Sequence, residues 1–266
     1  MKKRIVSLAV VLVLMLGLVL NFVNMSSNKF ISEADTNAGV EYLNSLSALS
    51  VEEVQKSVDK VQQKYLTIRQ QAQIKEAVEK SIKLIDKGEK SYRSVFKNVC
   101  FAGDSLMAGL ETYEILNSKK IIAQVSASLY HLEENMDTIV KKSPQVLILH
   151  YGINMIATED EYLNNFISLY TKLIKKLQKK LPETRIIVSL IFPVDRSLAT
   201  SERFKRVSAY NKALKKMCKG LDVEYLDSSS VLKAHKECYG SDGIHQSKAF
   251  YEKYWLKFIM REKGIY

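Results

Sequence analysis

At 266 residues, with 47% apolar and 26% charged side chains, the chain is long enough for one globular domain plus an appendage and is not an intrinsically disordered chain. Three prolines and ten glycines exclude a low-complexity linker, and three cysteines are too few for a disulfide framework. The net charge of +11 suits contact with anionic surfaces, but the lysines are scattered without interleaved aromatic residues, which predicts solvated helix faces and no nucleic-acid partner.

An apolar segment follows a basic N-terminus. Residues 1–4 are basic, and residues 5–20 are sixteen residues without a charge. A membrane-spanning helix needs about 20 apolar residues, whereas the core of a cleaved signal has about 7–15. Residues 21–25 offer no small-x-small cleavage pattern. We therefore expect residues 1–25 to be an uncleaved single-pass membrane anchor, with secretion after signal cleavage as the alternative. Because the basic flank stays in the cytoplasm, the rest of the chain is expected outside.

A helical stalk is predicted between the anchor and the remainder, over residues 26–95. Ser50 and Glu53 have the spacing of a capping box, and apolar residues then recur at steps of three and four, which predicts a helix from about 50 to 87. The clean heptads are too few for a coiled-coil dimer, so we expect the apolar stripe to pack within the chain. Its members are Val51, Val54, Val58, Val61, Tyr65 and Ile68, then in shifted phase Ile74, Val78, Ile82 and Ile85.

Short apolar runs alternate with amphipathic stretches from residue 98 onward. The helical patterns lie near 131–141, 159–181, 201–219 and 247–262. Continuous apolar strands linked by helices predict a parallel sheet covered on both faces, so residues 96–266 are expected to form a three-layer α/β/α domain. Functional sites in such sheets lie at the carboxyl ends of the strands. The predicted strands are 99–102, 121–125, 146–150, 185–192 and 223–226.

The cysteines carry no metal-ligand spacing, so we expect no zinc site. Cys100 lies in an apolar run and is predicted to be a buried thiol. Pairing of Cys218 with Cys238 outside the cell stays open, because the sequence gives no distance between them.

Polar residues follow the predicted strands at three places. Ser105 follows the first strand in the sequence Gly-Asp-Ser-Leu, and Asn154 follows the third in Gly-Ile-Asn. Asp242 and His245 precede the last helix. Taken singly, these are ordinary capping, turn and surface residues. Their joint order indicates chemistry, because a serine becomes nucleophilic beside a base that a carboxylate orients.

The three motifs together resemble the SGNH hydrolase family, also called GDSL lipases/esterases, from about residue 98 to the end. The resemblance implies a flavodoxin-like sheet of five parallel strands in the order 2-1-3-4-5. It implies that Ser105 is the nucleophile, that His245 is its base and that Asp242 orients the imidazole. It also implies that no metal or cofactor takes part.

The same resemblance implies an oxyanion hole made by the Ser105 amide, the Asn154 side chain and an amide from the turn after the second strand. In that turn the family has a glycine, whose place Ser126 takes here. If the place requires a positive φ, serine adopts it less readily than glycine. Met155 stands where many members have aspartate, which we interpret as a change in local support. Losing one oxyanion donor costs about 100- to 1,000-fold in turnover, so a damaged turn predicts a slow enzyme.

The resemblance and the expected location predict a membrane-anchored, extracytoplasmic serine esterase that acts through an acyl-enzyme on Ser105. The expected substrates are O-acetyl groups on cell-envelope or extracellular carbohydrate, with lysophospholipids and other lipid esters second. An O-acyltransferase of the same fold is a further alternative. A non-catalytic envelope-binding protein is the rival that Ser126 and Met155 favour and the intact motif residues oppose. Recruitment of a partner by the helix 50–87 is compatible with catalysis.

Overall fold

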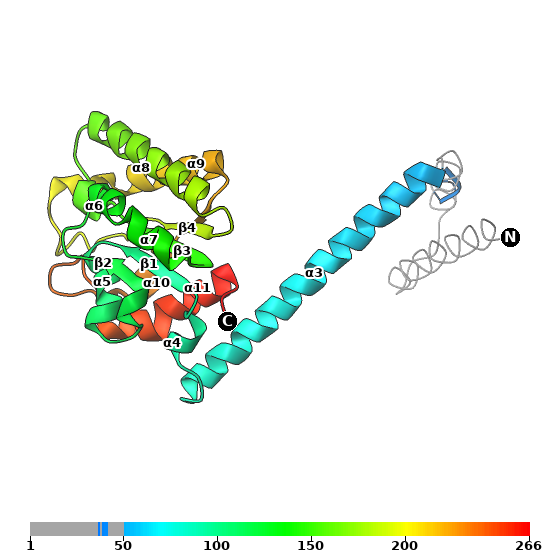
Figure 1. Ribbon diagram of the computed structural model, residues 1–266, viewed down its shortest axis with the longest axis horizontal. Coiled ribbons are helices and arrows are strands. Elements are labelled where there is room, and N and C mark those ends of the chain that lie inside the picture. The colour runs from blue at the N-terminus through cyan, green and yellow to red at the C-terminus, as the bar shows by residue number, and fades with distance from the viewer. Residues whose placement is uncertain (1–36, 38, 42–50) are drawn as a thin grey trace. The chain divides into compact units, whose positions relative to one another are not determined.

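The computed structural model describes residues 37, 39–41 and 51–266, in which a compact unit spans Ile68–Tyr266 (Figure 1). The predicted anchor, residues 1–25, lies outside the described residues, as do Ser50 and most of the first half of the predicted stalk. Within the described ranges, no helix combines the length and the apolar character needed to cross a bilayer.

Helix α3 (Val51–Asp86) forms where the apolar stripe predicts it. The second phase of the stripe packs only in part, since Val78 and Ile82 are buried but Ile74 is 39% exposed. The first phase does not, because Tyr65 and Ile68 are 70% and 51% exposed, so the expectation that the whole stripe packs within the chain is wrong. All residues from 59 to 76 are exposed, whichever side of α3 they occupy. The exposure of Tyr65 and Ile68 therefore does not depend on the phase of the stripe.

Ion pairs on two successive turns fix the C-terminal half of α3 to α11 (Leu256–Lys263). Arg261 donates to both carboxylate oxygens of Glu79, at 2.7 and 3.0 Å, and Lys257 pairs with Asp86. These contacts, with the burial of Val78 and Ile82, explain why the compact unit begins within the predicted stalk and includes the end of α3.

Five parallel strands form one sheet in the described part of the chain, in the order β2-β1-β3-β4-β5, which confirms the predicted parallel sheet and its strand order. The central strands β1, β3 and β4 are buried almost throughout, which is why they appear in the sequence as continuous apolar runs. Both edge strands are shorter than predicted. The strands are β1 (Val99–Gly103), β2 (Ile121–Ala123), β3 (Val146–His150), β4 (Arg185–Ser189) and β5 (Glu224–Leu226).

Helices cover both faces of this sheet (Figure 1), as the three-layer prediction requires. Successive strand residues alternate between two cores: Leu147 and Leu149 face one cluster, and Ile148 faces the other with Trp255. The first cluster is covered by α6 (Leu129–Glu134), α7 (Met136–Lys142), α8 (Asp160–Lys180) and α9 (Val207–Leu221). The second is covered by α4 (Tyr92–Val95), α5 (Ser105–Thr112), α10 (Ser229–Ala234), a π-helical turn (Phe250–Trp255), α11 and the end of α3.

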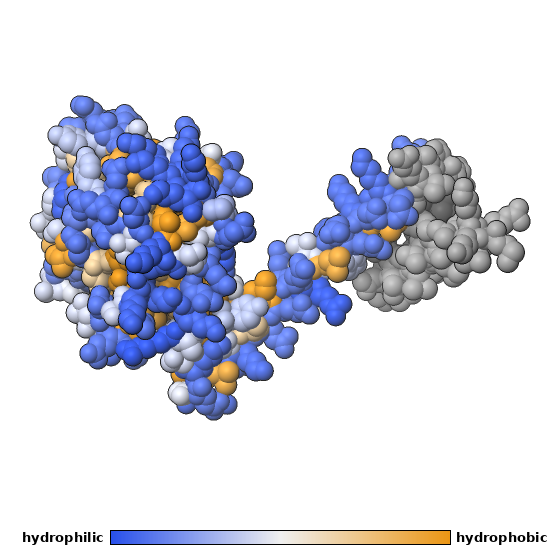
Figure 2. All heavy atoms as spheres, in the orientation of Figure 1, coloured by the Kyte–Doolittle hydropathy of each residue, from blue (hydrophilic) through white to orange (hydrophobic). Residues whose placement is uncertain are grey.

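The surface follows the composition. Figure 2 shows that the visible face of the compact unit is mostly hydrophilic, with small hydrophobic areas between hydrophilic side chains.

Cys100, Cys218 and Cys238 are all buried free thiols, so the prediction for Cys100 is confirmed and the other two are unpaired.

Candidate active site

Ser105 is the first residue of α5 and lies directly beyond β1. Gly103 ends the strand at a place where a Cβ would lie 2.5 Å from the carbonyl oxygen of His150 on β3, so a side chain there would push the two strands apart. Asp104 caps α5, and its carboxylate accepts from the amide of Leu106 at 3.1 Å. Because the first amides of a helix have no partner within it, the Ser105 amide is available beside its own hydroxyl.

A loop closed by the antiparallel bridge between Tyr239 and Gln246 carries Asp242 and His245. Nε2 of His245 lies 2.9 Å from Oγ of Ser105, and Nδ1 lies 2.5 Å from Oδ2 of Asp242. Residues 140 positions apart are thus joined in one chain of hydrogen bonds from carboxylate to imidazole to hydroxyl. The structure therefore brings together all three side chains that the sequence nominates for this role.

Asp242 is held as a carboxylate. Burial raises its pKa, but hydrogen bonds from the His245 ring and from the amides of Ile244 and His245, at 2.9 and 3.0 Å, outweigh that effect and lower the pKa to about 2. An ionised Asp242 accepts from Nδ1–H of His245, which leaves the lone pair of Nε2 directed toward Ser105. The His245 and Asp242 side chains are 50% and 47% exposed, so the site is open to solvent.

Asn154 lies in the 3-10 turn Ile153–Met155, which follows β3. The turn depends on Gly152, whose φ is +144° and whose added Cβ would lie 2.5 Å from Cδ1 of Ile191. The Asn154 amide nitrogen donates to the carbonyl oxygen of Ala127 at 3.0 Å. Because a side-chain amide carries two N–H groups, the second remains for an oxyanion.

Ser126 has a φ of +62°, so the turn after β2 does use the left-handed backbone that favours glycine. Serine adopts it here. The carbonyl of Ala127, the residue after Ser126, accepts from the Asn154 side chain. This hydrogen bond links the two predicted oxyanion donors, the Ser126 amide and the Asn154 side chain. Ser126 and Asn154 are both exposed on the open side of the sheet edge.

Two further residues support this turn, and one of them was missed from the sequence. Nδ1 of His131 accepts from the amide of Ser128 at 3.0 Å, and the sulfur of Met155 lies 3.4 Å from the amide nitrogen of Leu129. The Met155 contact agrees with a change in local support. The signal that could have identified His131 is the spacing Ser128-x-x-His131, which is that of a capping box with histidine in the place of glutamate.

Two titratable groups are buried beneath the site. Asp104 is fully buried, and its Oδ2 has no hydrogen-bond partner among the described residues. Burial raises the pKa of Asp104 to about 7 despite hydrogen bonds from backbone amides. Burial also lowers the pKa of His150 to about 3, so its ring is neutral and shares a hydrogen bond of 3.0 Å with Oγ of Ser189.

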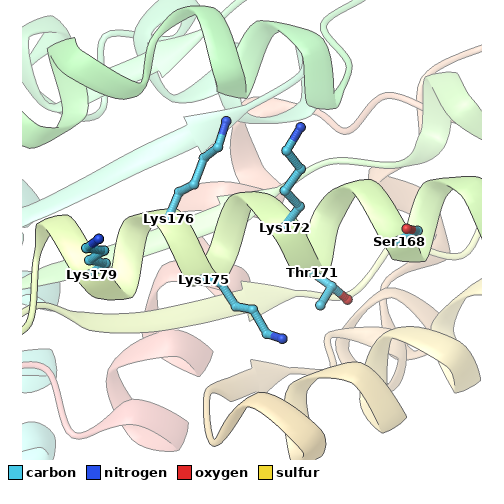
Figure 3. Close-up of a pocket in the computed structure, with 6 residues that line it drawn as sticks. All are labelled: Ser168, Thr171, Lys172, Lys175, Lys176 and Lys179. Atoms are coloured by element: carbon cyan, nitrogen blue, oxygen red, sulfur yellow. The ribbon is translucent and has the colours of Figure 1, made fainter.

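A shallow hollow on α8 is distinct from the site (Figure 3). Lysine stems line it together with Ser168 and Thr171. Lys172 and Lys176 point to one side of the helix and Lys175 to the other. Lys176 pairs with Glu133 at 2.6 Å. This hollow has the character of a charged, solvated helix face.

The model of the GDSL-like lipase/acylhydrolase family matches residues 101–253. No curated protein matches the chain. Among solved structures, a GDSL-like lipase from Bacteroides thetaiotaomicron is 11% identical with a TM-score of 0.47, and the match covers 69% of this chain and 96% of that chain. An acetylxylan esterase from Geobacillus stearothermophilus is 13% identical with a TM-score of 0.48, covering 63% of this chain and 94% of that one. The family match contains the serine, asparagine, aspartate and histidine described above.

Proposed function

The chain belongs to the GDSL-like lipase/acylhydrolase family and is a serine ester hydrolase, and from this premise we propose that Ser105, His245 and Asp242 cleave carboxylic esters through an acyl-enzyme. The observation that carries the proposal is the pair of hydrogen bonds at 2.9 and 2.5 Å that joins the three side chains. A nucleophile, its base and the group that orients the base need this arrangement.

In the proposed mechanism, Oγ of Ser105 attacks the ester carbonyl carbon while Nε2 of His245 takes the hydroxyl proton. The carboxylate of Asp242 stabilises the imidazolium that forms. The negative charge on the carbonyl oxygen is held by the amides of Ser105 and Ser126 and by the Asn154 side chain. His245 then returns the proton to the departing alkoxide, which leaves an ester on Ser105. Water, deprotonated by His245, cleaves that ester and restores the hydroxyl.

The open site favours a small acyl group on a large alcohol. The base and its carboxylate are about half exposed, and both Ser126 and Asn154 are exposed, so a bulky substrate can approach the nucleophile from solvent. A long acyl chain gains binding energy only where it buries apolar surface, at about 25 cal/mol per Å². We therefore propose O-acetyl groups on cell-envelope or extracellular carbohydrate as the substrate.

The location is proposed from the sequence. The uncharged residues 5–20 follow a basic end, which supports a single-pass anchor with the hydrolase outside. We propose that α3 acts as the stalk. Membrane fractionation and protease treatment of intact cells test this. The full chain should sediment with membranes and be digested in intact cells. A chain that is digested only after lysis contradicts the outside location.

The catalytic proposal is tested by comparing Ser105→Ala with Ser168→Ala, an exposed serine on α8 outside the site. With p-nitrophenyl acetate, the first variant should lose both the burst and steady-state turnover, and the second should match the wild type. Unchanged turnover in Ser105→Ala contradicts the assignment of the nucleophile. Absence of turnover by the wild type on any ester indicates the non-catalytic alternative.

The substrate proposal needs its own comparison. Acetyl esters, acetylated oligosaccharides, long-chain p-nitrophenyl esters and lysophospholipids should be offered to the full chain in parallel. Higher kcat/KM for the acetylated compounds supports the proposal, and higher kcat/KM for the lipid esters overturns it. With a carbohydrate acceptor present, release of free acetate supports hydrolysis, whereas acetylated acceptor indicates a transferase.

A further inference from the structure

We propose that His131 is a positioning residue of this esterase, which holds the turn around Ser126 in the backbone geometry that presents an oxyanion donor. The inference rests on the proposed function, because it concerns the oxyanion hole of that reaction. It addresses how the chain works with serine where its family has glycine.

The left-handed backbone of Ser126 costs conformational free energy, which contacts around the turn must offset. At a φ of +62°, the Cβ of Ser126 crowds the backbone, and residues other than glycine, asparagine and aspartate seldom adopt this region. A residue persists in such a conformation only where the surrounding structure fixes it. For glycine the same turn carries little cost. The serine therefore makes the turn dependent on its neighbours.

Backbone contacts on the N-terminal side of the turn are weak. The amide of Gln124 reaches the carbonyl of Gly103 at 3.4 Å, and the amide of Ala127 reaches that of Gln124 at 3.3 Å. Both distances exceed the usual 2.7–3.2 Å range for N–H···O bonds. β2 is an edge strand of the sheet and ends at Ala123, so strand pairing does not hold the residues of the turn that follows. The backbone alone provides little that would hold Ser126 at a positive φ.

The C-terminal side of the turn is held by side chains. The amide of Ser128 donates to Nδ1 of His131 at 3.0 Å, and Oγ of Ser128 lies 3.3 Å from the same nitrogen. The Asn154 side chain holds the carbonyl of Ala127 at 3.0 Å. Two side chains, His131 and Asn154, make these contacts, and Asn154 is itself a proposed oxyanion donor. His131 is therefore a brace that is independent of the reacting atoms, beside the longer contact of the Met155 sulfur with the Leu129 amide nitrogen at 3.4 Å.

A simple helix-capping role predicts something different. His131 is the third residue of α6, where glutamate or glutamine completes a capping box. If capping were its whole role, removing the acceptor would lower the melting temperature and leave kcat unchanged. If it braces the oxyanion turn, kcat falls with little change in KM, and a glycine at position 126 removes the dependence.

The test uses the full chain with p-nitrophenyl acetate. His131→Ala, and His131→Phe, which keeps a ring without the acceptor, are expected to lower kcat roughly 10- to 100-fold, below the roughly 100- to 1,000-fold of a lost oxyanion donor. His131→Gln supplies the amide oxygen of a normal capping box and should stay within about threefold of the wild type. His235→Ala, at a histidine outside this turn, is the matched control and should leave kcat unchanged.

The decisive comparison places the same substitution in a Ser126→Gly background. There, His131→Ala should lower kcat by less than about threefold, because glycine holds the left-handed geometry without the brace. Equal losses in both backgrounds, or a wild-type kcat in His131→Ala, overturn the proposal. If His131→Ala does not fold, His131→Phe and the double variant decide by the same criteria. Turnover that survives Ser105→Ala refutes the proposed function itself, and this outcome is distinguishable from a failure of the His131 proposal.

Discussion

Replacing Asp104 with asparagine is expected to stabilise the protein above neutral pH and to leave it nearly unchanged near pH 5. The Asp104 carboxyl is 0% exposed, and one of its oxygens has no partner among the described residues. Burial raises its pKa from an ordinary 3.8 to about 7. Asparagine keeps the oxygen that accepts from the Leu106 amide and removes the titrating group.

The sign follows from proton binding. Because the folded protein holds the Asp104 proton more tightly than the unfolded chain does, the free energy of unfolding falls as the pH rises from about 4 to about 7. A pKa difference of roughly 3, at ~1.4 kcal/mol per pKa unit, sets a cost on the order of 4 kcal/mol above that window. The asparagine N–H that replaces the unpaired oxygen costs about 1–3 kcal/mol. The net gain above neutral pH is therefore expected to be about 1–3 kcal/mol.

Urea unfolding of the full chain at pH 5, 7 and 8.5 measures this difference. Asp137→Asn is the matched control, since the Asp137 side chain is 91% exposed, and it should change the free energy of unfolding by less than about 0.5 kcal/mol. The stability curves of wild type and Asp104→Asn should separate as the pH rises. Curves that stay parallel, or an asparagine variant that loses stability at pH 8.5, refute the reasoning.

Three further outcomes are expected. Protonation of Asp242 should cause no loss of ester turnover between pH 4 and 6, because hydrogen bonds lower its pKa to about 2; an Asp242→Asn variant, which cannot ionise, should lower kcat throughout that range, and an unchanged kcat contradicts this. Tyr251→Phe should lower the free energy of unfolding by about 1–3 kcal/mol, measured in urea, because the buried hydroxyl donates to the Leu106 carbonyl at 2.7 Å. Gly152→Ala should lower the melting temperature and kcat together, because its φ of +144° suits only glycine, and unchanged values contradict that account.

The central strands and the proposed catalytic residues were predictable because each leaves a local pattern. β1, β3 and β4 are buried on both faces, so their sequences are continuous apolar runs. Parallel strands share one carboxyl edge, so Ser105 and Asn154 were expected there from their order in the sequence alone. The hydrogen-bond distances that make a serine nucleophilic follow only from the folded chain.

The exposure of α3, the role of His131 and the backbone of Ser126 depend on tertiary contacts that no local sequence pattern indicates. Tyr65 and Ile68 have the spacing of core residues, but they lie in the part of α3 where every residue from 59 to 76 is exposed. The role of His131 depends on the turn that Ser126 forms, and a lone histidine in a short helix does not reveal it. The positive φ at Ser126 was a conditional expectation that only the backbone decides.

The central claim is that Ser105 is activated by His245 across a hydrogen bond of 2.9 Å. Incubating the purified full chain with a fluorophosphonate and identifying the modified peptide by mass spectrometry tests it most directly. The account predicts one modified residue, Ser105, with a labelling rate that falls sharply in His245→Ala. Modification of a different residue, or ester cleavage that continues after Ser105 is fully labelled, contradicts it.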